Sequence, residues 1–378
     1  MTDSSISDVA FSELPAQGGK KIGVATLNVE KKLNSLNQNM VHGLTQQLTQ
    51  WASDDSIACV WLQGAGDKAF CAGGDVRCLR DKIEEVGPQQ ALEFVQGFFE
   101  NEYRLDYMIH TYAKPIMVWG HGIVMGGGIG LMSGASHRIV TETSRLAMPE
   151  ITIGLYPDVG GTWFLNHAPG RTGLFLGLTG ANINASDAIF VGMADRFIPS
   201  EQKANLLEQL QQSTFTHHAE ENAALINGVL RQIESQHQLP ESQVRQNYDL
   251  IQSVTDGDNL PQIVDNILAI ESDNKWLSKA VATLKSGCPT TAHLVYQQLQ
   301  RGKKLSLPEV FQMELVMSLQ CALHPDFPEG VRALLVDKDG APSWQHNSPA
   351  DVPKEWVDQH FASPWPGAEN PLSDINKN

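Results

Sequence analysis

The first half of the chain alternates between short apolar runs and longer stretches with helical spacing. The apolar runs are rich in β-branched residues, predict buried strands, and cover residues 21–29, 57–64, 114–124 and 137–143. Between the first two runs, residues 37–53 place Met40, Leu44, Leu48 and Trp51 at helical intervals, and a second helical stretch extends from about Pro88 to Tyr112. This alternation predicts an α/β architecture in which helices pack against a sheet.

The second half of the chain has a different pattern of apolar and polar residues. From about Ser200 to Leu319 the pattern is mostly helical, with no convincing strand, and Pro240 marks a loop between helices over residues 235–243. The tail from Pro364 to Asn378 is expected to be irregular. The predicted division is a polar, loosely ordered lead-in, a core and a helical C-terminal region, covering residues 1–20, 21–205 and 206–378.

Composition and charge limit the kinds of molecule that the protein is expected to bind. Of the 378 residues, 42% are hydrophobic and 19% are charged, which is typical of a globular protein. The formal net charge of −16 disfavours binding to nucleic acid and to anionic membranes. It does not exclude an anionic ligand, because local lysines and helix N-termini bind phosphate against the overall field. No run reaches the roughly 18–20 apolar residues that span a bilayer.

The cysteines and the N-terminal residues indicate the cellular compartment and whether a metal site is expected. The five cysteines are an odd number without regular spacing, so we expect reduced thiols and no disulfide framework. No pair has the spacing of zinc ligands, and we expect no metal. The first 20 residues contain acids, no arginine and no apolar core segment, which is unlike a secretory signal or a mitochondrial transit peptide. We therefore expect a cytoplasmic protein.

Two glycine-rich segments directly follow predicted strands. They are DKAFCAGGDVR (67–77) and GHGIVMGGGIGL (120–131). Where a strand gives way to a helix, backbone N–H groups lack partners, and the missing Cβ atoms allow a ligand to approach the main chain. Two such N–H groups that converge on one oxygen form an oxyanion hole. A single glycine run by itself is more often only a tight turn.

A third segment, PEITIGLYPDVGG (149–161), carries Glu150 and Asp158 on either side of an apolar run. Taken alone, Glu150 is more often a solvated residue, and Asp158, between Pro157 and Val159, is typical of a turn or an N-cap.

Together these three segments resemble the crotonase, or enoyl-CoA hydratase/isomerase, superfamily over roughly residues 20–200. The resemblance implies a crotonase-like superhelix of ββα units, an acyl-CoA substrate and a thioester carbonyl held by two backbone N–H groups. On this sequence those donors are Gly74 and Gly127, with Ala72 and Gly126 beside them at the substrate. Because CoA is part of the substrate, no separate cofactor is implied.

The acids depart from the hydratase pattern. Hydratases place one glutamate just beyond the glycine triplet and a second in the Pro-Glu motif, whereas this chain has Gly130 at the first position and Glu150 at the second. The stretch 148–165 instead resembles the 3-hydroxyisobutyryl-CoA hydrolase branch, in which Asp158 holds the substrate's 3-hydroxyl or orients Glu150. The segment 101–109 matches that branch with Glu102 at the acyl pocket. Residues 324–344 resemble its C-terminal signature.

These residues suggest a mechanism with open alternatives. Thioester hydrolysis needs stabilisation of the carbonyl oxygen and an activated nucleophile. Glu150 either attacks the carbonyl and forms an anhydride or deprotonates a water molecule. Cys71 lacks an adjacent histidine and is interpreted as a small buried hydrophobe, and His121 is interpreted as structural. Lys68 and Arg77 are interpreted as solvated, with phosphate contacts as the alternative.

The sequence therefore predicts a metal-free hydrolase of 3-hydroxyisobutyryl-CoA or a close β-hydroxyacyl-CoA such as 3-hydroxypropionyl-CoA, as in valine breakdown. The first alternative is an enoyl-CoA hydratase or isomerase that acts through Glu150 alone. The second is a non-catalytic acyl-CoA-binding protein, for which Glu150 would have no purpose. The family often forms trimers and hexamers, and a monomer is the alternative because the helical extension would cover the surfaces used.

Overall fold

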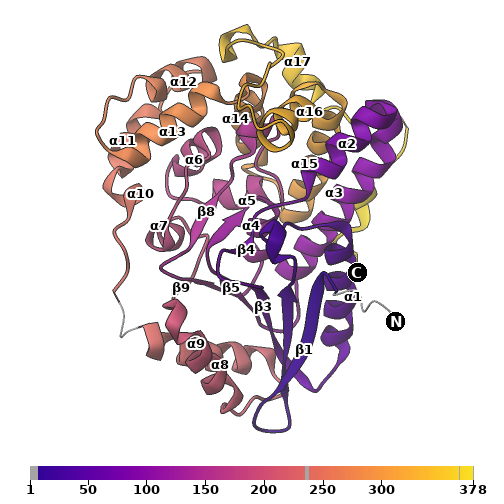
Figure 1. Ribbon diagram of the computed structural model, residues 1–378, viewed down its shortest axis with the longest axis vertical. Coiled ribbons are helices and arrows are strands. Elements are labelled where there is room, and N and C mark those ends of the chain that lie inside the picture. The colour runs from indigo at the N-terminus through magenta and orange to yellow at the C-terminus, as the bar shows by residue number, and fades with distance from the viewer. Residues whose placement is uncertain (1–6, 235–237, 366, 378) are drawn as a thin grey trace. The chain divides into compact units, whose positions relative to one another are not determined.

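The computed structural model describes residues 7–234, 238–365 and 367–377 (Figure 1). Its contacts divide the chain into two compact units, each assembled from three separate segments. The first, here called the sheet unit, consists of Met1–Gly74, Leu105–Leu146 and Asn184–Ser242. The second, the helical unit, consists of Asp75–Arg104, Ala147–Ile183 and Gln243–Asn378. Whether the sequence-based boundaries after residues 20 and 205 mark independent domains stays a prediction.

A six-stranded sheet forms the centre of the sheet unit, in the order β1-β2-β3-β5-β7-β9. Its strands are β1 (Val9–Pro15), β2 (Lys21–Leu27), β3 (Ile57–Gly64), β5 (Ile116–Gly120), β7 (His137–Val140) and β9 (Arg196–Phe197). Strand β1 is antiparallel to β2, and all other neighbours are parallel. Helices cover both faces of this sheet, which explains why the central strands are almost entirely apolar.

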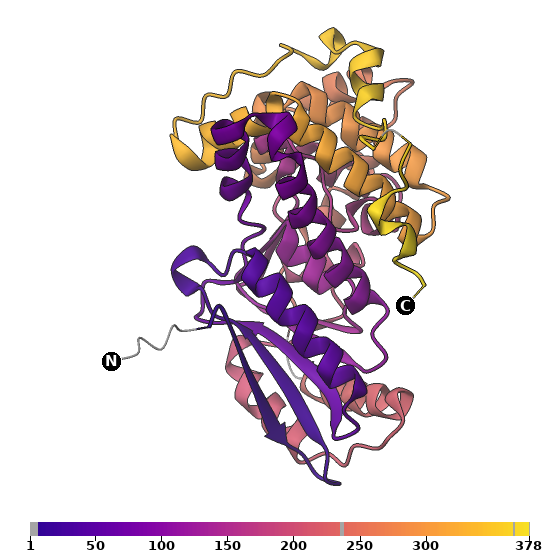
Figure 2. The ribbon, with the colours of Figure 1, turned by 90° about the vertical axis from the view of Figure 1, so that its right-hand side faces the viewer.

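The strand β3 shows how the two faces are filled. Cys59 and Trp61 point to the face covered by α8 (Lys203–Gln211) and α9 (Ala219–Glu234), where the indole of Trp61 stacks on that of Trp119 with 5.7 Å between the ring centroids. Val60 and Leu62 lie on the opposite face, against Leu44 and Leu48 of α1 (Gln38–Ser53). Figures 1 and 2 show α1 and the α8–α9 pair on opposite sides of the sheet. Side chains of alternate residues thus fill two separate cores.

A smaller sheet carries the glycine-rich turns. It has the order β4-β6-β8, and its strands are β4 (Ala69–Cys71), β6 (Ile123–Met125) and β8 (Arg145–Ala147). Strand β6 leads directly into α4 (Gly127–Ser133). The predicted single strand over 114–124 is thus wrong in detail, because Gly122, with a φ of +58°, separates β5 from β6.

Helices form nearly all of the regular secondary structure in the described part of the helical unit. Its longer ones are α2 (Val76–Val86), α12 (Leu260–Leu268), α13 (Lys275–Ser286), α14 (Pro289–Gly302) and α15 (Leu307–Leu323). The shorter ones are α5 (Gly161–Asn166), α6 (Thr172–Thr179), α10 (Gln243–Gln246), α11 (Tyr248–Val254), α16 (Asp326–Val331) and α17 (Lys354–Gln359). Helix α3 (Pro88–His110) begins in this unit and ends in the sheet unit, which also contains α7 (Ala185–Phe190).

Most elements expected from the sequence are confirmed. The α/β class, the helix over 37–53, the helix from Pro88 and the helical character beyond Ser200 all appear, and the described residues after Phe197 contain no strand. The loop expected over 235–243 is confirmed for residues 238–242, while 235–237 lie outside the described residues. The tail after Pro364 is irregular where it is described, apart from one short 3-10 turn over Pro371–Asp374.

The loosely ordered lead-in is wrong for its second half. Val9–Pro15 forms β1 and pairs along its whole length with β2, while residues 1–6 lie outside the described part. Gly18 and Gly19, with φ values of +79° and +75°, turn the chain between the two strands. The strand lies at the sheet edge, so most of its side chains stay exposed, and this weakens the apolar pattern that would have predicted it.

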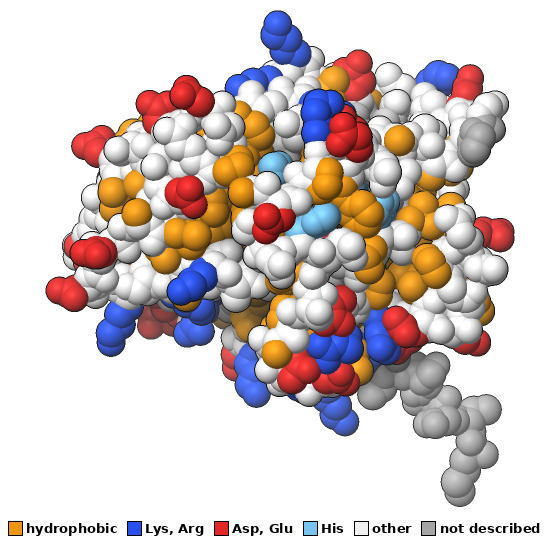
Figure 3. Space-filling model, turned by 90° about the horizontal axis from the view of Figure 1, so that it is seen from above, with side chains coloured by type: hydrophobic (Ala, Val, Ile, Leu, Met, Phe, Trp, Pro, Cys, Tyr) orange, Lys and Arg blue, Asp and Glu red, His pale blue; other side chains and the backbone are white. Residues whose placement is uncertain are grey.

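Within the ranges that the structure describes, no helix combines the length and the apolar character needed to cross a bilayer. On the face drawn in Figure 3, acidic and basic side chains lie scattered and near one another, and they do not gather into one patch.

Candidate active site

The first glycine segment is a turn at the end of β4. The Ala72 N–H donates to the Leu33 carbonyl at 3.1 Å, and the Leu36 N–H donates to the Gly73 carbonyl at 2.8 Å. Gly73 has a φ of +107°, which residues with a side chain rarely adopt. Among the described residues, the N–H of Gly74 donates to no backbone carbonyl. Two hydrogen bonds thus fix the turn and leave this N–H available.

The second glycine segment forms the start of α4. Gly126 precedes the helix with a φ of +46° and a ψ of −122°, a combination that only glycine accommodates. The N–H groups of Ile129 and Gly130 donate to the Gly126 carbonyl, whereas the N–H of Gly127 donates to no carbonyl in the described part of the chain. The first N–H groups of a helix have no partner within it, so Gly127 presents a donor.

The fold brings these two turns together inside the sheet unit. Strands β4 and β6 are parallel, with Ala69 opposite Ile123, so both end at the same edge of the small sheet. A Cβ atom on Gly128 would lie 2.3 Å from the Cys71 carbonyl oxygen, which shows how closely α4 approaches the end of β4. The structure thus places the Gly74 and Gly127 turns side by side, which an oxyanion hole requires.

Glu150 begins a short 3-10 turn in the helical unit, Glu150–Ile153, just after β8. Its side chain is 5% exposed, and its Oε2 atom has no hydrogen-bond partner among the described residues. Burial raises the pKa of this carboxyl well above its ordinary value, and the Asp158 carboxylate raises it further. Glu150 is therefore a buried acid that holds its proton tightly and has one oxygen available.

Asp158 and Glu102 complete a cluster of three buried acids in the helical unit. Asp158 is 5% exposed and accepts a hydrogen bond of 2.7 Å from the Tyr103 hydroxyl, and burial raises its pKa to about 6. Glu102, on α3, is 2% exposed, and its Oε1 has no partner among the described residues. Burial and the charge of Asp158 raise the pKa of Glu102 well above its ordinary value. Acids this close do not all ionise together.

Four residues around these acids were not predicted from the sequence, namely Tyr103, Tyr156, Glu314 and Ser318. The Tyr103 hydroxyl lies 2.7 Å from the Ser318 hydroxyl, which lies 2.8 Å from the Tyr156 hydroxyl. Glu314 is fully buried and accepts hydrogen bonds from two backbone N–H groups of the segment after Asp158. A signal for Glu314 exists in the sequence, because it is an acid inside the apolar run of α15. Nothing in the sequence pairs Ser318 with either tyrosine.

The other residues that the sequence offered for a chemical role either contact the backbone or lie exposed. Cys71 is buried, and its Sγ lies 3.7 Å from the Gly73 carbonyl oxygen. His121 is buried, with Nε2 at 2.8 Å from the Gly66 carbonyl oxygen, and burial lowers its pKa. Lys68 and Arg77 are exposed, and the Arg77 guanidinium donates to the Leu335 carbonyl. All five cysteines are free thiols, as expected.

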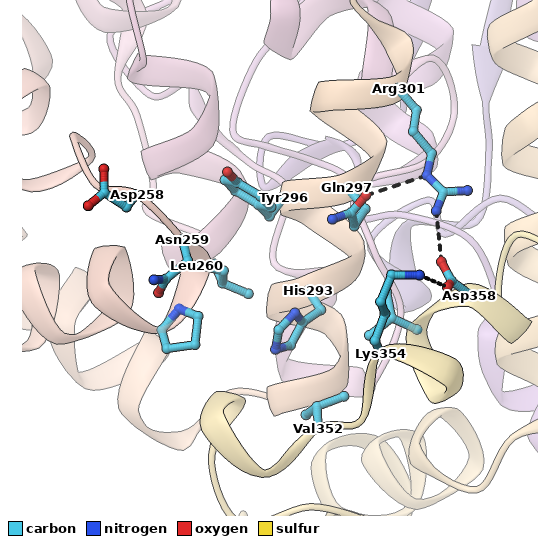
Figure 4. Close-up of a pocket in the computed structure, with 12 residues that line it drawn as sticks. Asp258, Asn259, Leu260, His293, Tyr296, Gln297, Arg301, Val352, Lys354 and Asp358 are labelled. Atoms are coloured by element: carbon cyan, nitrogen blue, oxygen red, sulfur yellow. Dashed lines mark hydrogen bonds and ion pairs between the residues drawn. The ribbon is translucent and has the colours of Figure 1, made fainter.

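A surface cavity of about 370 Å³ lies elsewhere in the helical unit, between α12, α14 and α17 (Figure 4). Arg301 and Lys354 both form ion pairs with Asp358 there, and Arg301 also donates to Gln297. Because this cavity contains none of the three buried acids, it offers no comparable chemistry. Across the described ranges, no group of three or more His, Cys, Asp or Glu side chains is arranged to hold a metal ion. The expected absence of a metal or cofactor stays a prediction.

Comparison with known proteins decides the family. The family model described as enoyl-CoA hydratase/isomerase matches residues 22–361. The chain belongs to this family. Similar curated proteins include the mitochondrial 3-hydroxyisobutyryl-CoA hydrolase of Danio rerio, 38% identical over 95% of this chain and 91% of that protein. The Homo sapiens protein of the same name is 35% identical over 90% of this chain and 86% of its own length.

Solved structures agree on the fold. The crystal structure of an enoyl-CoA hydratase from Rhodobacter sphaeroides has a TM-score of 0.82 and 35% identity, and it covers 95% of this chain and 98% of that chain. A carnitinyl-CoA dehydratase from Mycobacterium thermoresistibile reaches 0.81 at 32% identity, over 94% of this chain and 97% of that chain.

The family membership confirms the predicted crotonase resemblance and fold. The curated relatives are named mitochondrial, so the comparisons do not support the predicted cytoplasmic location.

Proposed function

We propose that this protein hydrolyses 3-hydroxyisobutyryl-CoA, or a close β-hydroxyacyl-CoA such as 3-hydroxypropionyl-CoA, to the free acid and CoA. Membership of the enoyl-CoA hydratase/isomerase family supports an acyl-CoA substrate. The names of the curated relatives, which match nearly the whole chain, support the hydrolytic reaction.

The proposed reaction breaks the C–S bond of the thioester. The N–H groups of Gly74 and Gly127 stabilise the oxyanion, and each such donor contributes about 3–4 kcal/mol to lowering a barrier of this kind. Glu150 must first lose its tightly held proton. Its carboxylate then either attacks the carbonyl carbon, giving an anhydride that water cleaves, or takes a proton from the attacking water. In both routes the sulfur leaves with the bonding electron pair and is protonated to the free thiol. The reaction requires that Glu150 and both amides act on one carbonyl.

The pair of Glu102 and Asp158 suits a substrate that carries a 3-hydroxyl. A hydroxyl both donates and accepts a hydrogen bond. Burial and the neighbouring charge favour the protonated form of Glu102, whose pKa is raised well above the ordinary value, while Asp158 has a pKa of about 6 and is ionised at neutral pH. One acid is therefore a donor and the other an acceptor. Such a pair favours a β-hydroxyacyl group over an unsubstituted one.

A single observation carries the proposal: Glu150 is buried with an unpartnered carboxyl oxygen, while Gly130, in α4, provides no second acid. Hydration across a double bond by the route usual in this family uses both acids. The alternative function, an enoyl-CoA hydratase or isomerase, is favoured by the name of the similar solved structure from Rhodobacter sphaeroides, an enoyl-CoA hydratase. The absence of an acid at position 130 argues against it.

Release of free CoA measures the proposed activity directly. Purified protein is mixed with 3-hydroxyisobutyryl-CoA and a coloured thiol reagent. Background from the protein is expected to be small, because burial raises the pKa of Cys59, Cys78, Cys288 and Cys321 and keeps these thiols protonated. The wild type is expected to release thiol, and Glu150→Gln to lower kcat by about 10²–10⁴-fold, the usual contribution of a positioned base.

The matched control is Glu93→Gln, the same chemical change at an exposed position of α3. It is expected to retain the wild-type rate. Crotonyl-CoA is tested in parallel, and its enoyl absorbance is expected to stay constant. Wild-type activity in Glu150→Gln, or loss of enoyl absorbance without thiol release, would contradict the proposal.

Other expectations about the working protein stay predictions. A trimer, a hexamer and a monomer differ in mass, so sedimentation equilibrium distinguishes them. Imaging a tagged full-length chain in its own cell type tests the compartment.

A further inference from the structure

Helix α15 carries a buried acid, Glu314, that binds the backbone of a distant segment. Glu314 is fully buried, and its two carboxyl oxygens accept two backbone hydrogen bonds: the Gly160 N–H donates to Oε2 at 2.8 Å, and the Thr162 N–H donates to Oε1 at 2.9 Å. Both donors lie at the start of α5, where a helix leaves N–H groups without partners. One acidic side chain, more than 150 positions away along the chain, thus holds the backbone of this turn at two points.

The turn that Glu314 holds is strained. Val159 has a φ of +51° and Gly160 a φ of +86°. For a β-branched residue this left-handed conformation is a genuine outlier, which persists only where the surroundings enforce it. Asp158 comes directly before these two residues. The position of the Asp158 carboxylate therefore depends on a backbone conformation that would relax without support.

The same helix supports Asp158 from a second direction. Ser318 lies one turn beyond Glu314, and its hydroxyl is 2.7 Å from the Tyr103 hydroxyl that donates to Asp158. Tyr103 and Phe311 also pack with 5.8 Å between ring centroids, and Figure 1 shows α15 beside α3. Residues four apart on a helix share a face, so Glu314 and Ser318 act from one surface of α15. One fixes the backbone next to Asp158, and the other fixes its hydrogen-bond donor.

We propose that Glu314 is a positioning residue that, through the strained turn Val159–Gly160, holds Asp158 where it binds the 3-hydroxyl of the substrate. This inference rests on the proposed function. It predicts that Glu314 matters for recognition of the hydroxyl more than for cleavage of the thioester itself.

Substrate discrimination tests this role. Glu314→Gln keeps the side-chain volume but turns one acceptor into an NH₂ donor that faces a backbone N–H. We expect kcat/KM for 3-hydroxyisobutyryl-CoA to fall at least tenfold, with most of the change in KM. For isobutyryl-CoA, which lacks the hydroxyl, the change is expected to stay within about twofold. A merely structural defect would lower both values by the same factor.

A double-mutant cycle with Asp158→Asn tests the coupling. If Glu314 acts through Asp158, the two substitutions together lower the preference for the hydroxyacyl substrate no more than Asp158→Asn alone. Independent, multiplying effects would overturn the proposal. Glu309→Gln is the matched control, since Glu309 also accepts a backbone N–H on α15 but at its exposed start. It is expected to change neither substrate's kcat/KM.

The pH profile of hydroxyacyl hydrolysis gives an independent readout. The titratable side chains whose charge acts on Asp158 or is affected by it are Glu102, Tyr103, Glu150, Tyr156, Glu314 and Cys321. Displacement of Asp158 in Glu314→Gln alters its hydrogen bond with Tyr103, so the acidic limb is expected to move. Glu309→Gln is expected to leave the limb in place. An unmoved limb in Glu314→Gln would count against the proposal.

Amide hydrogen exchange measures directly whether Glu314 holds the backbone of the turn. Exchange at Gly160 and Thr162 is expected to be at least tenfold faster in Glu314→Gln than in Glu309→Gln. Should Glu314→Gln fail to fold, Ser318→Ala serves in its place, because it removes only the second support. It is expected to produce the same selective loss of kcat/KM on the hydroxyacyl substrate. An equal loss on both substrates would overturn the role assigned to α15. A wild type that releases no thiol overturns the proposed function alone. Faster exchange in Glu314→Gln would then still support its hold on the turn, and unchanged exchange would overturn it.

Discussion

At the scale of single residues, Glu102, Glu150 and Asp158 are buried acids whose environment alters their chemistry. Each loses hydration on folding, and the charge of Asp158 acts on the other two. Removing a carboxylate from water favours its protonated form. The sequence predicted all three as site residues. It contained no information on their burial, because burial depends on neighbours that are distant along the chain.

The raised pKa of Asp158 predicts a gain in stability when its charge is removed. The folded protein binds this proton with a pKa of about 6, against 3.8 for the ordinary group. Because the native state holds the proton more tightly, the contribution of Asp158 to stability is greatest below pH 3.8 and falls as the pH rises towards 6. This difference between the two pKa values corresponds to about 3 kcal/mol. Asp158→Asn keeps an acceptor for Tyr103 and is expected to raise the free energy of unfolding at pH 7 by up to about 3 kcal/mol.

Urea unfolding between pH 4 and pH 7 checks this expectation. The difference between Asp158→Asn and the wild type should grow as the pH rises from 4 to 6 and then level off. Asp249→Asn, at an exposed position of α11, is the control and should differ little from the wild type at any pH. An Asp158→Asn variant that is less stable than the wild type at pH 7 would contradict the argument.

At the scale of elements, the parallel pairing of β4 with β6 sets the two glycine turns beside each other. The sequence predicted both turns from their glycines and from the strands before them. It did not predict β4, which lies inside the first glycine-rich segment, or the pairing of β4 with β6, because pairing is decided by the arrangement of the whole sheet. Similarly, the edge strand β1 was missed although Gly18 and Gly19 signal a turn, since most of its side chains are exposed and its apolar residues do not alternate strictly with polar ones.

Gly128 tests the contact between α4 and β4. A Cβ atom at this position would lie 2.3 Å from the Cys71 carbonyl oxygen and 2.9 Å from the Cys71 Cβ. Gly128→Ala must therefore push the helix away from the strand, and we expect a loss of about 1–3 kcal/mol in the free energy of unfolding. Because the Gly127 N–H moves with the helix, thiol release should fall as well.

The matched control for Gly128→Ala is Gly228→Ala on α9, where no atom lies within 4 Å of the added Cβ. Inside a helix, alanine is favoured over glycine, so this variant should gain about 0.5–1 kcal/mol and keep its activity. Chemical denaturation and the thiol assay measure both variants. Equal behaviour of the two would show that α4 does not rest on β4 as described.

At the scale of the whole molecule, the two compact units are interleaved along the chain. The helical unit combines Asp75–Arg104, which carries Glu102, with Ala147–Ile183, which carries Glu150 and Asp158, and with the C-terminal segment that carries α15. A division into successive domains at residue 205 separates the acids from Glu314 and Ser318. The C-terminal segment is thus part of the structure that surrounds the acids.

A chain that ends at residue 205 is therefore expected to lose its activity. Without α15, its bonds to the acid cluster and the neighbouring turn disappear, among them those of Ser318 with Tyr103 and of Glu314 with Gly160 and Thr162. The three buried acids would then face water and lose the packing that holds them. Thermal unfolding by circular dichroism should show no cooperative transition, and thiol release should be absent, with the full chain as the control. Hydrolysis by residues 1–205 at a rate near that of the full chain would contradict this view.

The sequence alone determined the identity of the chemical groups and the local shape of the chain around them. Glycines after strands, apolar periodicity and the Pro-Glu and Pro-Asp pairs are local patterns, and local patterns reflect backbone preferences that act over a few residues. Only the tertiary structure decided which of these groups meet, how deeply Glu150 is buried and that Glu314 supports the turn after Asp158. Desolvation, charge interaction and strain arise between residues that are far apart in the chain, so they exist only once the chain has folded.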